Sequence, residues 1–218
     1  MKRRWLFLGA LAPYRRTSQG QADAAVCGPE LSTYATGPLP SEFQAAWRTG
    51  QGKPGDWQVV EDTTASRGKA IAQVSTDTTD YRFPLAVWQP LVAKDLDARL
   101  RIKAVAGTVD RAGGVVVRLL DADNYYVARA NALEDNVNLY RVVQGRRQQI
   151  AGASVKVPSG IWHALGLRAD GDRLTVNFNG KDILTATDRT FAGAGKVALW
   201  TKADSITWFD RLEIQARQ

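Results

Sequence analysis

The sequence predicts an all-β protein, a two-sheet antiparallel β-sandwich of the jelly-roll type. Apolar residues at 96, 98, 100, 102 and 104 alternate with charged residues, which is the period of a strand with one buried and one wet face. Asp170-Gly171 and Asn179-Gly180 flank a second alternating segment and are dipeptides typical of tight hairpin turns. After residue 50, strand-like segments recur every 8 to 14 residues and none has a helical period. This spacing favours two packed sheets.

Each expected strand is bounded by turns that contain Asp, Asn or Gly. The alternation at 96–104 is the clearest strand, and the segment 173–178 between the two turn dipeptides is the next clearest. The other expected strands are 115–120, 125–130, 137–143, 162–169, 183–187, 197–201 and 206–214.

Composition and charge exclude several classes of protein. The 218 residues include one cysteine and one histidine, which excludes an internal disulfide framework and any zinc site that needs several histidines. The net charge of +7 divides into +3 for residues 1–40 and +4 for the remainder. Basic and acidic residues interleave, so we expect no nucleic-acid partner.

The N-terminal 40 residues read as a secretion leader followed by a flexible linker, before a single β-sandwich domain at 41–218. Three basic residues at 2–4 precede a short apolar run at 5–12, as in secretory leaders, so we expect a secreted or periplasmic protein. A cytosolic tail is the alternative. A lipid anchor at Cys27 is less favoured, because Ala24-Ala25-Val26 fits the required pattern poorly. The chain has no apolar run near the ~20 residues that span a bilayer, so we expect no transmembrane helix.

Strand parity predicts which side chains face outward from one curved sheet. Placing Val115, Val117 and Leu119 in the core turns Arg118 outward, and the same reasoning applies to the strands near 128, 139 and 199. The predicted outward face consists of Arg118, Tyr125, Arg129, Asn131, Asn138, Tyr140, Trp200 and Lys202. Aromatic rings with planar hydrogen-bonding groups suit a sugar, which has apolar C–H faces and a rim of hydroxyls. The alternative is that Trp200 is buried and the arginines form ordinary ion pairs.

Three segments carry a resemblance to a known family. They are 121–143, 161–191 and 195–214, and they contain Trp162, Asp170-Gly171-Asp172, Asn179-Gly180, Trp200-Thr201-Lys202 and Phe209-Asp210 in order. Over roughly residues 41–216 the chain resembles the 3-keto-disaccharide hydrolase domains of the concanavalin A-like, laminin G-like superfamily. The resemblance implies an exported bacterial protein linked to glycan breakdown, with an oligosaccharide or polysaccharide as partner. It names neither the sugar nor an oligomeric state.

Catalysis has weaker candidates than binding. Ordinary glycoside hydrolysis needs two carboxylates roughly 5 to 10 Å apart, and Glu134-Asp135 is the obvious acidic pair, although neighbours on a strand point to opposite faces. A 3-keto sugar instead allows elimination by a base beside a cation. His163 is the candidate base, with Lys202 or Arg118 stabilising the enolate, and a hydrogen-bonded structural histidine is the alternative.

Two further possibilities complete the expectations. Asp210 on the last strand is a candidate ligand for a structural calcium ion together with the loop 52–56; the alternative is a hydrogen bond from backbone amides to Asp210. No other cofactor is expected. A laminin G-like structural or protein-binding module without sugar affinity is a third functional class.

Overall fold

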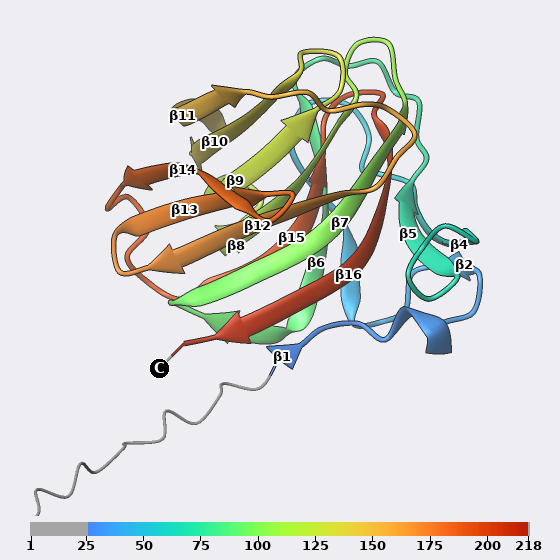
Figure 1. Cartoon of the computed structure of the whole chain (residues 1–218), viewed down its shortest axis with the longest axis horizontal. Helices are drawn as coiled ribbons and strands as arrows, with labels where there is room; N and C mark the ends of the chain where they lie inside the picture. The colour runs from blue at the N-terminus through green and yellow to red at the C-terminus, as the bar shows by residue number, and fades with distance from the viewer. Residues whose placement is uncertain (1–25, 218) are drawn as a thin grey trace, which may run out of the picture.

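The chain folds as an all-β sandwich of two antiparallel sheets, one lying over the other (Figure 1), which confirms the predicted fold class. The computed structural model describes residues 26–217. The expected leader falls in residues 1–25, outside the described part, so secretion stays a prediction. None of the helices in the described part of the chain has the length and apolar character that crossing a bilayer requires.

The first sheet has nine strands, in the order β14-β13-β12-β7-β16-β5-β4-β2, with β1 paired to β16 beside this path. Its strands are β1 (Val26–Cys27), β2 (Gly37–Pro38), β4 (Trp57–Glu61), β5 (Lys69–Gln73), β7 (Leu96–Ala106), β12 (His163–Asp170), β13 (Arg173–Phe178), β14 (Lys181–Thr187) and β16 (Ile206–Ala216).

The second sheet has seven strands, in the order β11-β10-β9-β8-β15-β6-β3. Its strands are β3 (Phe43–Gly50), β6 (Arg82–Ala93), β8 (Ala112–Asp121), β9 (Asn124–Asn131), β10 (Asn136–Val143), β11 (Arg146–Ser154) and β15 (Gly195–Thr201).

Alternation and turn chemistry shape these strands as predicted. Leu100 and Ile102 of β7 lie in the core between the sheets, whereas Arg99, the residue before Leu100, is exposed. Gly171 and Asn179-Gly180 adopt the positive φ values of tight hairpin turns, +57°, +48° and +85°. Side chains that alternate in this way must bury one face, and the two sheets bury theirs against each other.

The parity prediction for the seven-stranded sheet is correct on three strands and on the first part of a fourth. The residues expected inside, among them Tyr126, Leu139 and Leu199, lie in the inter-sheet core, together with Val115 and Val117. We call the opposite side of this sheet its outer face.

The prediction is wrong at Arg118, because β8 contains a bulge there. Lys196 and Ala198 of β15 pair with Leu119 and Val116, so two residues of β8 oppose one residue of β15. Arg118 has a φ of +49°, and Leu119 packs on the outer face instead of in the core. The extra residue reverses the alternation from this point on.

The seven-stranded sheet curls so far that its margins touch across the outer face. Thr49 Oγ1 of β3 lies 2.7 Å from the Tyr125 hydroxyl of β9. Tyr81, just before β6, donates its hydroxyl to the Gly145 carbonyl at 2.9 Å and accepts the Arg147 backbone N–H at 2.9 Å. A second apolar cluster fills the curl, and it includes Phe83, Val116, Val127 and Trp200. Much of the outer face is therefore closed by its own sheet.

Residues 26–40 lie against the nine-stranded sheet. Besides the pairing of β1 with β16 and of β2 with β4, the short 3-10 helix η1 (Leu31–Thr33) places Leu31 in the inter-sheet core at 4% exposure. This segment, expected as linker, is packed on the sandwich.

Candidate functional site

A cross-strand row on the outer face places several predicted residues side by side. Trp200 of β15 pairs with Gly114 of β8, Gly114 with Arg129 of β9, and Arg129 with Asn138 of β10. A Cβ on Gly114 would lie 2.7 Å from the Ala128 carbonyl oxygen and 3.1 Å from Arg129 Cβ. The glycine therefore leaves the space in which Arg129 packs.

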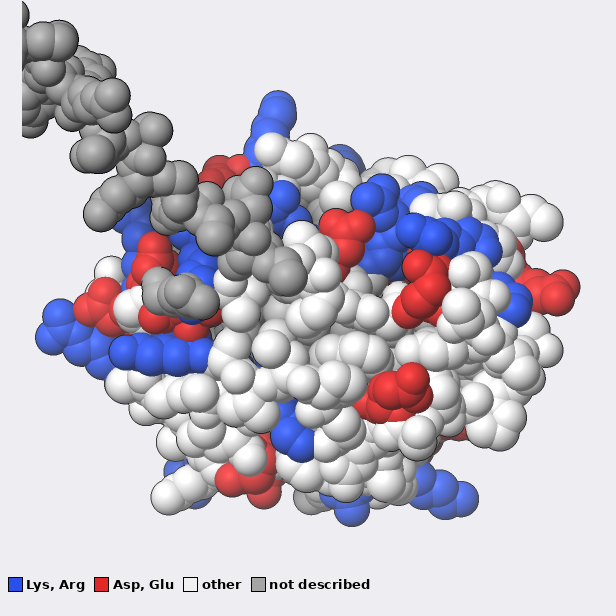
Figure 2. Space-filling view, turned by 90° about the horizontal axis from the view of Figure 1, so that it is seen from below, with Lys and Arg blue, Asp and Glu red and all other residues white. Residues whose placement is uncertain are grey.

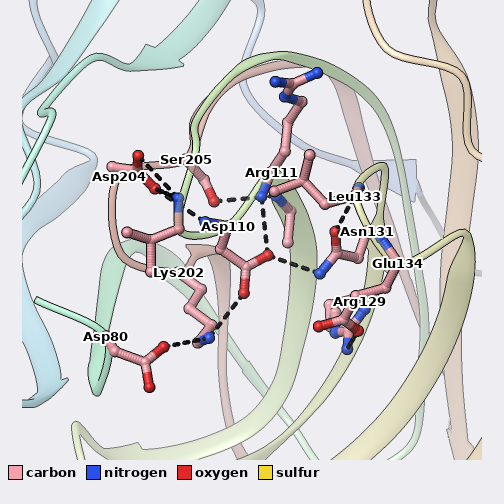
Figure 3. Close-up of polar contacts among 12 residues, drawn as sticks. Asp80, Asp110, Arg111, Arg129, Asn131, Leu133, Glu134, Lys202, Asp204 and Ser205 are labelled. Atoms are coloured by element: carbon pink, nitrogen blue, oxygen red, sulfur yellow. Dashed lines mark hydrogen bonds and ion pairs between the residues drawn. The ribbon is translucent and has the colours of Figure 1, made fainter. Parts of the chain in front are cut away.

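Polar side chains gather where β9 and β15 end and where β6, β8 and β10 begin. We call this cluster the polar site: Asp80, Asp110, Arg129, Asn131, Glu134 and Lys202 (Figure 3). Lys202 Nζ lies 2.9 Å from Asp110 Oδ2 and 2.6 Å from Asp80 Oδ1. Asn131 approaches Asp110 from the other side, and its Nδ2 donates to Oδ1 at 2.7 Å.

Arg129 forms the second half of the polar site. Its Nη2 lies 2.7 Å from Glu134 Oε2 and donates to the Tyr140 hydroxyl at 3.0 Å, while Nη1 donates to Asn136. The Asn138 amide group lies 2.9 Å from the same hydroxyl. Arg129 and Asp110 are buried, but Glu134 and Asp80 have 48% and 74% of their side-chain surface exposed. The cluster therefore meets solvent through two carboxylates.

Neighbouring charges and hydrogen bonds shift the pKa values of three groups of the polar site toward their charged forms. Burial raises the pKa of Glu134, but hydrogen bonds from Asn136 and Arg129 and the charges of Arg129 and Lys202 outweigh burial, so the pKa is lowered. The hydrogen bond and charge of Lys202 lower the pKa of Asp80. Burial lowers the pKa of Lys202, but its two carboxylate partners outweigh burial and raise it.

A buried carboxylate holds the loop that carries Asp110. Asp204 accepts backbone N–H groups of Thr108, Val109 and Asp110 at 2.7, 3.1 and 3.0 Å, and it also accepts the Thr108 hydroxyl. Burial raises the pKa of Asp204, but these hydrogen bonds outweigh it and lower the pKa. The loop is thus fixed by a residue that follows β15, only two positions after Lys202.

The predicted aromatic residues lie beneath the surface. Trp200 and Tyr125 have no exposed surface, and Tyr140 retains 7%. Trp200 stacks on Phe83 with ring centroids 5.5 Å apart, and the Arg147 guanidinium lies 4.7 Å from the Phe83 centroid and 4.6 Å from that of Tyr140. The expected open aromatic platform is therefore covered in this structure.

Arg118 lies away from the polar site, at the other end of β8. Its guanidinium donates to the carbonyl oxygens of Lys94, Phe191 and Gly171 at 2.8, 2.8 and 2.6 Å, and to Asp95 Oδ1 at 2.9 Å. The side chain is fully buried. It holds two turns and the segment before β15 together, so a role in contacting a ligand or stabilising an enolate does not fit its position.

The three catalytic candidates lie in different places. Glu134 belongs to the polar site, but Asp135 has a φ of +50° and pairs with Lys156 at 2.6 Å. His163 is on β12 of the other sheet, 96% buried, with Nε2 3.0 Å from the Pro158 carbonyl and Nδ1 3.2 Å from Asn179 Nδ2. The ring also stacks on Phe178. These contacts are those of a structural histidine, and the polar site holds neither Asp135 nor His163.

Asp210 has partners that do not fit a calcium ligand set. Its Oδ2 accepts the Ser66 N–H at 2.8 Å and lies 3.1 Å from Arg101 Nη1, and its Oδ1 accepts the Ser66 hydroxyl. The loop beside it contains Ser66 and is not the expected 52–56. The described residues include no group of three or more Asp, Glu, His or Cys side chains that could hold a metal.

The sequence interpretation missed Asp80 and Asp110. Both lie in connections between strands, where no periodic pattern indicates which way a side chain points. Asp110 lies shortly before the predicted strand at 115–120, which was an available signal, whereas no strand was predicted beside Asp80. Figure 2 shows acidic and basic side chains interspersed on the side of the molecule that it displays.

Comparisons with known proteins reveal similar structures at low sequence identity. No family model matches the chain, and no curated protein matches it. A carbohydrate-binding module, CBM66, from Bacillus subtilis superposes with a TM-score of 0.64 at 19% identity, covering 80% of this chain and 96% of the module. A β-glucanase from Bacillus licheniformis has a TM-score of 0.56 at 11% identity, over 83% and 95% of the two chains.

A third similar structure is domain 4 of AbnA, a GH43 extracellular arabinanase from Geobacillus stearothermophilus, in complex with arabinotriose. Its TM-score is 0.55 at 15% identity, over 80% of this chain and 82% of that one. At such identities these likenesses establish the fold, a concanavalin-like sandwich, and nothing finer.

Proposed function

We propose that the chain binds an oligosaccharide or polysaccharide through the polar site and serves extracytoplasmic glycan breakdown. The observation that carries the proposal is the pairing of Lys202 with Asp110 and Asp80 beside the pair of Arg129 with Glu134. Carboxylates accept hydrogen bonds from sugar hydroxyls, while guanidinium and ammonium groups donate to hydroxyl oxygens. The exposed carboxylates of Glu134 and Asp80 can accept from hydroxyls of one ring, while Arg129 and Lys202 hold them in place.

The kinds of protein found among the similar structures support this proposal. One is a carbohydrate-binding module, one is an arabinanase domain in complex with arabinotriose, and one is a β-glucanase. The resemblance to 3-keto-disaccharide hydrolase domains points in the same direction. We therefore propose a secreted or periplasmic saccharide-binding protein of this superfamily.

The charge state of the site favours binding over ordinary glycoside hydrolysis. A general acid needs a carboxyl with a raised pKa, whereas the pKa values of Glu134 and Asp80 are lowered by their partners. Cleavage of a 3-keto-glycoside stays the enzymatic alternative, because Arg129 and Lys202 could stabilise an enolate in the polar site.

Calorimetric titration with arabinose, arabinotriose, glucose, cellotriose and a 3-keto-glycoside tests the proposal. We expect at least one saccharide to bind, and Glu134→Gln and Asp80→Asn to weaken that binding about tenfold, since each removes an exposed charged acceptor. The matched control is Asp182→Asn, an exposed carboxylate of β14 on the other sheet, which should leave binding unchanged.

The same incubations are examined for released product. Release from the 3-keto-glycoside alone would favour the enzymatic alternative. Equal affinity in the wild type and in both site variants would contradict the proposal.

A further inference from the structure

Arg147 covers three aromatic rings on the outer face of the seven-stranded sheet. It comes from β11 at one margin, yet its guanidinium carbon lies 4.7 Å from the Phe83 ring of β6, 4.6 Å from the Tyr140 ring of β10 and 5.9 Å from the Trp200 ring of β15. Arginine over aromatic faces is a favourable cation–π arrangement. The side chain therefore occupies an aromatic slot that the curled sheet forms.

The hydrogen-bond donors in this slot are not all paired with acceptors. Arg147 Nη1 is buried without a hydrogen-bond partner, and Trp200 Nε1 beneath it lies near the Tyr125 hydroxyl without a hydrogen bond of normal geometry. Trp200 has no exposed surface, so water does not accept a hydrogen bond from its N–H. A buried donor without an acceptor is costly and offsets much of what the ring contacts contribute. Two such donors in one slot indicate a place where an oxygen atom of a ligand would accept hydrogen bonds.

The cover comes from an edge strand. β11 pairs only with β10, and each of its nine residues is partly or fully exposed. On the far side, Arg147 is tied by one hydrogen bond, from its backbone N–H to the Tyr81 hydroxyl. Edge elements with few buried contacts are the first to open locally.

The covered slot is continuous with the polar site through Tyr140. The ring of Tyr140 lies under Arg147, and its hydroxyl accepts from Arg129 Nη2 at 3.0 Å. A ligand ring in the polar site would therefore have its next unit beside these aromatic rings.

We propose that Phe83, Tyr140 and Trp200 form a second saccharide subsite, and that Arg147 is its displaceable cover. The subsite takes the apolar C–H face of a neutral sugar ring, whose oxygen atoms accept from Trp200 Nε1. This inference rests on the proposed function, because the first sugar unit binds in the polar site. Arg147 then sets the specificity for chain length: a monosaccharide leaves it in place, and a longer chain displaces it.

Arg147→Ala tests the cover, with Arg146→Ala as the matched control, since Arg146 is the exposed neighbour on the same strand. Acrylamide quenching of tryptophan fluorescence should rise in Arg147→Ala and not in Arg146→Ala, and adding Trp200→Phe should abolish the rise. Arabinotriose or cellotriose, whichever binds the wild type, should bind Arg147→Ala about tenfold more tightly. The affinity for the corresponding monosaccharide should not change.

Other results overturn the inference in distinguishable ways. Unchanged quenching and unchanged trisaccharide affinity in Arg147→Ala would refute the subsite alone. A rise in quenching without saccharide binding by any variant would refute the proposed function and with it the sugar assignment. If Arg147→Ala does not fold, trisaccharide titration of the wild type and Trp200→Phe decides: an emission change that Trp200→Phe lacks supports the subsite, and the same response in both refutes it.

Discussion

Lys202 and Asp110 form the most buried ion pair of the polar site, with Nζ and Oδ2 2.9 Å apart and side-chain exposures of 14% and 4%. Asp110 also accepts from Asn131, and Lys202 reaches outward to Asp80. One ammonium group thus joins a buried acceptor to an exposed one. Removing it leaves the buried charge without its only cationic partner among the ion pairs of the described residues.

Lys202→Met should destabilise the fold and abolish saccharide binding. An uncompensated buried carboxylate costs about 3 kcal/mol, so the free energy of unfolding in urea should fall by about that amount. Asp80→Asn should cost under about 1 kcal/mol, because Asp80 is 74% exposed. Equal losses in the two variants would contradict the assigned roles.

Asp204→Asn should loosen the loop that carries Asp110. The asparagine amide nitrogen would face donors that now point at a carboxylate oxygen, so we expect a loss of about 2 kcal/mol. Saccharide affinity should fall as well, since Asp110 is displaced. Urea unfolding and calorimetry measure the two effects. Wild-type affinity in a folded Asp204→Asn protein would show that the loop is positioned by other contacts.

Acid should weaken the protein through its paired carboxylates. The pKa values of Glu134, Asp80 and Asp204 are lowered in the fold. The unfolded chain therefore binds protons first, and the stability from these groups is complete above the ordinary carboxyl range of about 4 and is lost as the pH falls below it. Urea midpoints from pH 7 to pH 3 should be level at first and then fall. The fall should be smaller in Asp204→Asn, and an identical slope in both proteins would contradict the assignment of Asp204.

Arg118→Ala should lower the free energy of unfolding more than most substitutions. It should not change the saccharide affinity of the protein that remains folded. It removes four hydrogen bonds from a buried guanidinium and leaves three carbonyl groups without that donor. We expect a loss of about 3 kcal/mol or more. Arg189→Ala, which removes an exposed partner of the partly exposed Asp172, should cost under about 1 kcal/mol. A cost for Arg118→Ala as small as that control would refute the structural role.

Gly195→Ala tests the bulge itself. A Cβ there would lie 2.7 Å from Arg118 Cα, closer than real contacts allow, so we expect a loss of about 2 kcal/mol from the displaced bulge. Gly193→Ala is the matched control, because nothing lies within 4 Å of its Cβ position. The control should be neutral or slightly stabilising. Similar unfolding free energies for the two variants would show that the bulge adapts.

These residues also show how far the sequence could be interpreted. Alternation and turn dipeptides are local signals, so the strand at Leu96–Ala106 and the hairpin turns at 171 and 180 could be predicted. A bulge depends on two strands at once, and nothing near Arg118 distinguishes it from a regular strand position. Its side chain was therefore assigned to the wrong side.

The candidate site was predictable only in part. Parity placed Arg129, Asn131 and Lys202 on one face, where the structure finds them in contact with Glu134 and Asp110. The covering of Trp200 could not be predicted, because it depends on how strongly the whole sheet curls and on a guanidinium from a distant edge strand. Such closure is a property of tertiary structure.

The hydrogen bonds of the Arg118 guanidinium have an evolutionary implication. One guanidinium unites the turn at 94–95, the turn at 171 and the segment before β15, at the end of β8 remote from Asp110. With that end secured, the connections bearing the exposed Asp80 and Glu134 can accept new residues at little cost to the scaffold. Descendants of this molecule could thereby exchange one ligand for another by altering two short loops.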